Sequence, residues 1–211
     1  MTLTEPTRRE RKKEETRRRI FTAAISLFRE KGFEQTTVDE ITEKADVGRG
    51  TFFNYFPRKE SVLAFLSEER LEVAEENGQV LLAEARPVRD KLIEVYAFAA
   101  SAYTEDRELS RYVFNEWMQR AFAPTEEVGC RWEKLLLKII EQGQGNGELR
   151  SDVAADRMES VLSSVYMSTL YFWLCCPLGM PEGSDFALVD EVKARIGLVI
   201  DGLGARSEVK S

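Results

Sequence analysis

Apolar residues along this chain recur at intervals of three and four, and no segment alternates convincingly between apolar and polar residues. The recurring spacing places apolar side chains on one face of an α-helix, whereas a half-buried strand needs the alternating pattern. Ile20, Ala24, Leu27 and Phe28 form the first such stripe. The pattern predicts an all-α fold of about nine helices.

Capping and helix-breaking residues divide this pattern into segments. Gly32 ends the first helix, Thr37 and Glu40 form a capping box that begins the second, and Pro57 ends the third. The predicted helices cover about residues 14–31, 37–45, 49–56, 57 to beyond 71, 88–104, 108–122, 125–142, 152–175 and 186–203.

Charge is distributed unevenly over the 211 residues, whose net charge is −7. Residues 1–60 hold 14 Lys and Arg against 11 Asp and Glu, whereas the remainder holds 16 against 26. A basic amino-terminal part on an acidic body is expected when one end of a chain meets a polyanion. We expect a disordered basic leader over residues 1–13, a domain over 14–74 and a larger helical domain over 75–211.

The chain contains no histidine and 3 cysteines. The absence of histidine removes most zinc sites and every histidine-based catalytic triad. No convergent acid, base, nucleophile or cofactor fingerprint replaces them, so we predict no enzyme activity, no metal and no cofactor. Sparse cysteines fit a reducing compartment, and no secretory signal opens the chain, so we expect a cytoplasmic protein.

Residues 14–56 predict a helix-turn-helix, because two short helices joined by a tight turn follow a longer one. On a helical wheel of residues 49–56, Phe52 and Phe56 lie together with Phe53 on their flank, and we expect all three to point inward. The opposite side carries Gly50, Thr51 and Asn54, and Arg49 can reach outward from the first turn. On this face Gly50 offers a bare backbone for close approach to DNA, and Thr51 offers a methyl and a hydroxyl group. The Asn54 amide is suited to adenine, and the Arg49 guanidinium is suited to guanine.

Three further side chains are candidates for phosphate contacts around this face. Thr37 caps the second helix, whose amino-terminal amides attract an anion, and Lys59 lies at the start of the fourth. Tyr55 adds a phenol at the edge. Each has a simpler interpretation: Thr37 as a cap alone, Lys59 as the partner of a nearby carboxylate, and Asn54 as a solvated side chain.

These residues resemble the amino-terminal domain of the TetR family of transcriptional regulators over about residues 14–74. The matching positions are Gly32-Phe33, Thr36-Thr37-Val38, Ile41, Ala45, Val47, Gly50 to Phe56 and Lys59-Glu60. The resemblance implies an all-helical homodimer with a helix-turn-helix DNA-binding domain and a carboxy-terminal domain that binds a small molecule. It implies phosphate contacts at Thr37, Tyr55 and Lys59, and groove contacts at Arg49, Gly50, Thr51 and Asn54.

Three positions depart from the family pattern. Asp46 replaces a glycine in the turn, and we expect the turn to survive because Asp tolerates the left-handed conformation. Gly48 replaces a serine, which keeps a cap but loses a hydroxyl contact. Phe53 replaces a tyrosine, which puts one phosphate hydrogen bond in doubt.

The last two predicted helices, about residues 152–175 and 186–203, match the dimer bundle that the resemblance implies. Residues 160–181 carry no charge and hold several small residues, which allow close helix approach. The same stretch is long enough to span a bilayer, but its acidic flanks and hydroxyl residues favour a buried or interface helix. A membrane-tethered or soluble helical interaction protein without sequence-specific DNA binding is the alternative hypothesis.

Aromatic residues are frequent in the middle helices, and most are expected in the core. Tyr103, Trp117 and Tyr166 are our candidates for lining a ligand pocket, because pockets favour aromatic groups with a polar edge. Their chemistry predicts a small apolar or aromatic effector rather than a metal ion. The leading hypothesis is a repressor that binds a pseudo-palindromic operator as a homodimer and is released by such an effector.

Overall fold

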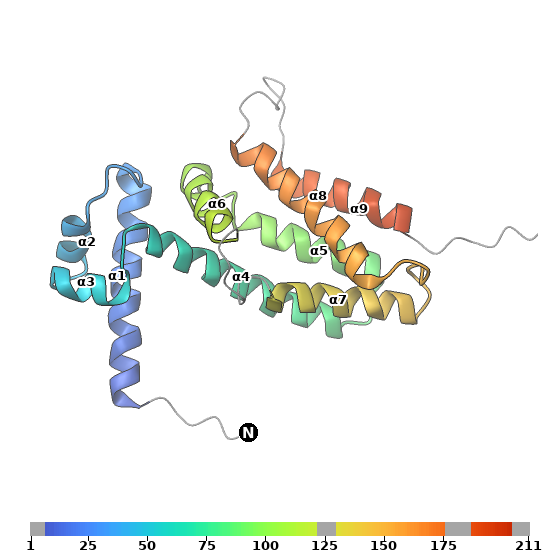
Figure 1. Ribbon diagram of the computed structural model, residues 1–211, viewed down its shortest axis with the longest axis horizontal. Helices are drawn as coiled ribbons and strands as arrows, with labels where there is room; N and C mark the ends of the chain where they lie inside the picture. Colours follow the sequence, from blue (N-terminus) through green and yellow to red (C-terminus); the bar gives the residue numbers. More distant parts are fainter. Residues whose placement is uncertain (1–6, 122–129, 176–186, 204–211) are drawn as a thin grey trace, which may run out of the picture.

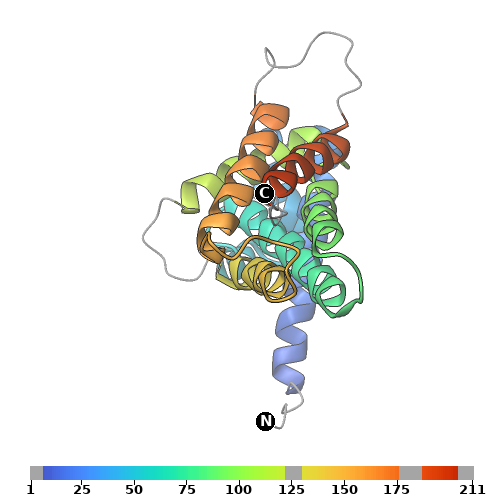
Figure 2. The same cartoon turned by 90° about the vertical axis from the view of Figure 1, so that its right-hand side faces the viewer.

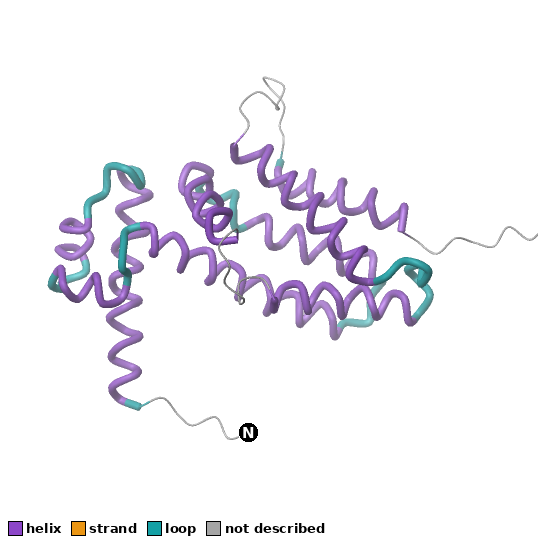
Figure 3. The backbone as a smooth tube through the Cα atoms, viewed as in Figure 1, coloured by secondary structure: helices purple, strands orange, loops and turns teal. Residues whose placement is uncertain are grey.

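The computed structural model describes residues 7–121, 130–175 and 187–203. In these ranges the chain forms nine helices and no strand, which confirms the predicted all-α fold (Figure 3). The helices are α1 (Arg8–Lys31), α2 (Val38–Lys44), α3 (Arg49–Tyr55), α4 (Glu60–Ala83), α5 (Val88–Ser101), α6 (Arg107–Ala121), α7 (Cys130–Gly145), α8 (Ala155–Cys175) and α9 (Leu188–Leu203).

One end of the molecule, which we call the head, consists of α1, α2, α3 and the first half of α4 (Figure 1). Its core is rich in aromatic side chains, whose burial removes a large apolar area from water. The large apolar side chains that are fully or nearly fully buried in this core include Ile20, Phe28, Phe33, Ile41, Phe52, Phe56, Val62 and Leu63.

The other end, which we call the body, is formed by the rest of α4 with α5, α7, α8 and α9. In this bundle α5 packs on α9, and α8 packs on α7 and α9 (Figure 2). The 24 residues of α4 span about 36 Å at 1.5 Å per residue, which is enough to cross from one core to the other. Along α4 the packing changes from the head core at Leu66 to the body core at Leu81.

Helix α6 connects the head to the body. Leu109 and Val113 belong to the head core, whereas Phe114 of the same helix belongs to the body core. Arg58 at the end of the head forms an ion pair with the buried Glu116 at 2.6 Å. The predicted domain boundary at residue 75 placed this helix in the carboxy-terminal domain alone, because a helical stripe does not reveal which core it faces.

Two predicted boundaries were wrong. The expected disordered leader is helical from Arg8 onward, because Thr7 and Glu10 form a capping box that begins α1 there; residues 1–6 lie outside the described ranges. The basic start of α1 projects beyond the other helices (Figure 2). A helix break was expected at Gly143, but α7 continues to Gly145. Gly143 is needed there for packing, because a side chain at this position would collide with Val88 and Leu149.

We predict that Phe52→Ala lowers the free energy of unfolding by about 3–5 kcal/mol, because a buried ring is replaced by a cavity in the head core. Phe52 is 0% exposed, whereas its neighbour Phe53 is 41% exposed. The matched variant Phe53→Ala should change that free energy by less than about 1 kcal/mol. Urea unfolding followed by circular dichroism measures both, and equal losses would contradict this packing.

Candidate functional site

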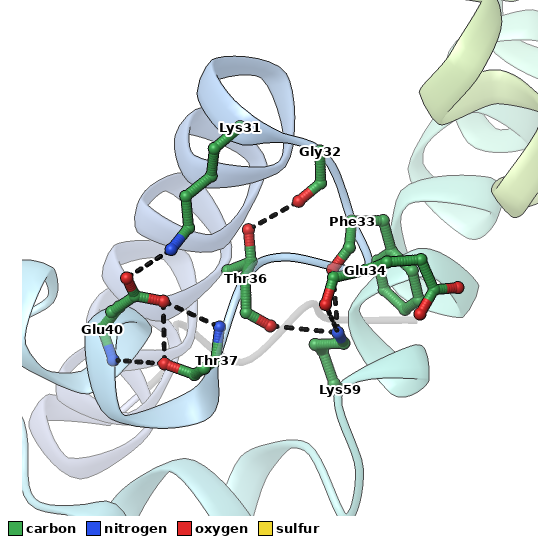
Figure 4. A network of polar contacts seen from close by, with 8 residues as sticks. All are labelled: Lys31, Gly32, Phe33, Glu34, Thr36, Thr37, Glu40 and Lys59. Atoms are coloured by element: carbon green, nitrogen blue, oxygen red, sulfur yellow. Dashed lines mark hydrogen bonds and ion pairs between the residues drawn. The ribbon is translucent and has the colours of Figure 1, made fainter.

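The start of α2 is fixed by a polar network around Glu40 (Figure 4). The Thr37 hydroxyl accepts a hydrogen bond from the Glu40 backbone N–H, and the Glu40 carboxylate accepts one from the Thr37 N–H at 2.9 Å. This is the predicted capping box. The Lys31 ammonium also binds the Glu40 carboxylate. Hydrogen bonding from Lys31, then from the Thr37 backbone and side chain, lowers the pKa of Glu40 from 4.5 to about 2.

Lys59 lies at the amino-terminal end of α4, as expected, and its ammonium binds the loop between α1 and α2 (Figure 4). It donates to the carbonyl oxygens of Phe33 at 2.8 Å, Thr36 at 3.0 Å and Glu34 at 3.5 Å. The ammonium also lies 4.3 Å from the centre of the Phe33 ring. The three donors of this ammonium therefore hold the head together, and a phosphate contact by Lys59 stays a prediction.

The turn between α2 and α3 has the geometry that its residues predict. Asp46 has a φ of 51°, and no other non-glycine residue among the described residues has a positive φ. Its carbonyl oxygen accepts a hydrogen bond from Arg19 at 3.2 Å, which ties the turn to α1. Gly48 is the N-cap of α3 and supplies no side-chain cap. The predicted survival of the turn with Asp46 is confirmed.

Helix α3 is anchored by two of its three phenylalanines. Phe52 and Phe56 are buried and lie 5.9 Å apart between ring centres. The expectation that Phe53 also points inward was wrong, since its ring is exposed and lies edge-on to Phe52 at 5.4 Å. The buried positions are four residues apart, so the residue directly after the first is turned toward the edge of the helix.

The opposite side of α3 faces solvent. Gly50 and Asn54 are exposed and Thr51 and Tyr55 are half-buried, with Tyr55 packed on the head core. The Arg49 side chain reaches outward, where its guanidinium binds the Asp39 carboxylate of α2 at 3.0 Å and lies 5.9 Å from the centre of the Phe53 ring. The predicted uncharged polar face of α3 thus points away from the core. The exposed Phe53 ring lies at the solvent as well, which the helical wheel did not predict.

A second candidate site is a cavity of about 180 Å³ in the body. All three aromatic residues predicted for a pocket line it: Tyr103, Trp117 and Tyr166. The wall also contains Ser67, Arg70, Leu71, Ala74, Ala99, Trp132, Ser163, Met167 and Leu170. Arg70 and Ser163 were not predicted, because nothing in the spacing of polar residues along α4 and α8 marks them.

The described residues contain no group of three or more Cys, Asp or Glu side chains that could hold a metal ion. None of the helices in the described ranges is both long and apolar enough to cross a membrane. Helix α8, which holds most of the uncharged stretch, contributes its buried residues to the body core.

A short helix anchored by buried phenylalanines, after a capped helix and a tight turn, defines a helix-turn-helix protein. The family model described as bacterial regulatory proteins, tetR family, matches residues 20–65, which lie within the head. Thermus thermophilus FadR, a TetR-family transcriptional repressor solved in complex with lauroyl-CoA, is 30% identical with a TM-score of 0.68. The match covers 92% of this chain and 98% of that one. The chain therefore belongs to the TetR family of transcriptional regulators.

Two other proteins are similar to this chain over most of its length. The HTH-type transcriptional repressor KstR of Rhodococcus jostii is 27% identical over 168 residues, which cover 76% of this chain and 73% of KstR. A crystal structure of FadR from Bacillus subtilis in complex with stearoyl-CoA has a TM-score of 0.64 at 20% identity, covering 87% of this chain and 97% of that one. The second likeness supports the fold.

We predict that the free energy of unfolding falls more steeply with acidification in the wild type than in Glu40→Gln. The lowered pKa means that the Glu40 carboxylate stabilises the folded state fully above about pH 4.5, and that this contribution is lost as the pH falls toward about 2. Glu43→Gln, at an exposed glutamate of the same helix, is the matched control. Urea unfolding at several pH values measures the slopes, and identical slopes for wild type and Glu40→Gln would refute the assignment.

Proposed function

We propose that this protein is a repressor that binds a pseudo-palindromic DNA operator as a homodimer and is released by a small-molecule effector. The observation that carries this proposal is the solvent-facing side of α3, held outward by the burial of Phe52 and Phe56. The DNA-binding part is residues 14–74, and residues 75–211 form the larger domain that binds the effector and the second subunit. Part of the effector cavity wall is supplied from the first of these ranges by α4, through Ser67, Arg70, Leu71 and Ala74. The change of core along α4 between Leu66 and Leu81 supports this division.

The outward side of α3 carries the base contacts. Asn54 presents an amide to adenine, and Gly50 and Thr51 allow close approach and contact with a thymine methyl group. Arg49 can bind guanine after exchanging its Asp39 partner, because an exposed ion pair contributes only about 0–1 kcal/mol. The exposed Phe53 ring adds an apolar surface for a thymine methyl group.

Phosphate contacts flank this face and position the head without selecting sequence. Thr37 and Gly48 lie at the amino-terminal ends of α2 and α3, where free backbone N–H groups attract an anion. Tyr55 and Lys59 complete the proposed set. Since the Lys59 ammonium binds three loop carbonyls, its phosphate contact requires exchange of one of them.

The outer faces of α8 and α9 support dimerisation through these two helices. Val161, Tyr171 and Phe172 on α8 and Leu198 on α9 are large exposed apolar side chains. Small residues accompany them, with Ser164 and Ser168 exposed on α8 and Ala194 and Gly202 exposed on α9. Such a surface suits close packing against the same pair of helices in a second copy. In a two-fold dimer the two α3 helices would lie about 34 Å apart, one turn of DNA.

The cavity in the body is the proposed effector site, with Tyr103, Trp117 and Tyr166 among its contacts. Most of its wall is apolar or aromatic, which suits an apolar or aromatic effector. The binding of lauroyl-CoA by Thermus thermophilus FadR supports an effector with a hydrocarbon portion. Helix α6 carries Trp117 at the cavity and Leu109 and Val113 in the head core, so a shift of α6 would reach the DNA-binding surface.

We predict that Asn54→Ala weakens binding to the preferred site by about 1–3 kcal/mol and relaxes the base preference at one position. Selection from random duplexes, followed by competition binding with single-base variants at fixed salt, measures both effects. Asn115→Ala, at an exposed asparagine of α6, is the control and should leave both unchanged. An unaltered base preference in Asn54→Ala would remove Asn54 from the base contacts.

We predict that Leu198→Glu converts the homodimer to a monomer at micromolar concentration, because it places a charge in the apolar face of α9. Leu198 is 75% exposed in the single chain. Val80→Glu is the control, since Val80 is 61% exposed but lies on α4, outside the proposed interface. Sedimentation equilibrium distinguishes the two states. A Leu198→Glu protein that sediments like the wild type would exclude this face as the interface.

A further inference from the structure

Arg70 brings a guanidinium group to the wall of a mostly apolar cavity. Its described hydrogen bond is to the hydroxyl of Ser110, a fully buried residue of α6, at 3.3 Å. The guanidinium also lies 5.3 Å from the centre of the Tyr103 ring. A single long hydrogen bond to a neutral hydroxyl leaves most of the five donors of this group unused.

No carboxylate of the described residues forms an ion pair with Arg70. The two acidic residues that act electrostatically on Arg70, Glu105 and Asp106, have other partners. Glu105 binds Arg29 at 2.9 Å, and Asp106 accepts a hydrogen bond from the Leu109 backbone N–H at 2.9 Å. Burial of the guanidinium lowers the pKa of Arg70. A partly buried charge without a counter-ion is costly, and an anionic ligand would remove that cost.

Two phenol groups line the same cavity as Arg70. Neither the Tyr103 hydroxyl nor the Tyr166 hydroxyl has a hydrogen-bond partner within the described part of the chain. Burial raises the pKa of both phenols, so both remain protonated and able to donate. The cavity therefore presents one guanidinium and two O–H donors, while Leu71, Trp132 and Leu170 supply apolar wall.

We propose that Arg70 and the hydroxyls of Tyr103 and Tyr166 bind the carboxylate of the effector, so that the ligand is a free apolar monocarboxylic acid. This inference rests on the proposed use of the cavity as the effector site. A guanidinium matches a carboxylate through two parallel hydrogen bonds, and the two phenols can donate to its remaining lone pairs. The hydrocarbon part of the acid fills the apolar remainder of the cavity.

The same contact supplies a link to α6. When Arg70 turns to the ligand carboxylate, it gives up its hydrogen bond to Ser110, which adjoins Leu109 in the head core. The carboxylate therefore changes a contact between α4 and α6, the two helices that run from the cavity to the head. A neutral ligand of the same length fills the cavity but leaves the Arg70–Ser110 contact in place.

The test compares octanoate with 1-octanol, which have the same chain length and differ in charge. Binding to the purified full chain is followed by tryptophan fluorescence, because two of the three tryptophans, Trp117 and Trp132, line the cavity. We expect the wild type to bind octanoate at least about tenfold more tightly than octanol, as charge-assisted hydrogen bonds imply. Arg70→Met should abolish this preference without weakening octanol binding, and Arg70→Lys should retain part of it.

Two further variants separate a ligand contact from a folding defect. Arg111→Met removes an exposed arginine of α6 and should behave like the wild type. The double variant Tyr103→Phe/Tyr166→Phe removes the two hydroxyls and should reduce octanoate affinity while octanol affinity stays constant. It tests the site even where Arg70→Met does not fold, as judged by circular dichroism.

Equal affinity of the wild type for octanoate and octanol would overturn the carboxylate site and leave the effector cavity standing. Absence of binding by octanoate, by octanol and by lauroyl-CoA would overturn both the carboxylate site and the effector cavity. Lauroyl-CoA is the third probe: binding that depends on Arg70, with no binding of octanoate, would assign the polar groups to an acyl thioester and overturn the free acid. Operator binding, measured separately without ligand, tests the DNA-binding proposal independently of all three results.

Discussion

The burial of Phe52 and Phe56 in the head core is the contact on which the DNA-binding surface depends. Helix α3 has only 7 residues, and a helix of that length is not stable by itself in water. Its conformation is therefore maintained by packing against α1, α2 and the start of α4. Because the two rings are four residues apart, the same packing that forms α3 also turns Gly50 and Asn54 toward solvent.

Two helices connect this surface to the cavity in the body. Helix α4 is continuous from the head to the body, and α6 contributes apolar side chains to both cores. Arg70 on α4 and Ser110 on α6 form a hydrogen bond, and the ion pair of Arg58 and Glu116 joins the end of the head to α6. In the proposed mechanism, an effector that alters the contact between α4 and α6 acts on elements that are already part of the head core.

Local signals in the sequence were sufficient to predict the helix-turn-helix. The capping box of Thr37 and Glu40, the positive φ of Asp46 and the N-cap at Gly48 each depend on residues within a few positions. The wheel also identified the exposed side of α3 but misplaced Phe53, because an angle on a wheel does not show how far a neighbouring element covers a flank. Tyr103, Trp117 and Tyr166 all line the cavity, but so does Trp132, which the sequence did not distinguish from the aromatic residues of the core.

The sequence by itself determined the helices, most of their ends and the side of α3 that avoids water, since these follow from the period of apolar residues and from capping within one turn. Only the tertiary structure decided which core α6 joins, that Lys59 binds the loop between α1 and α2, and that Arg70 meets Ser110 in a cavity. Those contacts join residues 23–40 positions apart in the chain, and their geometry arises from the packing of whole helices. No local pattern records such a distance, because it depends on how separate helices share their apolar faces.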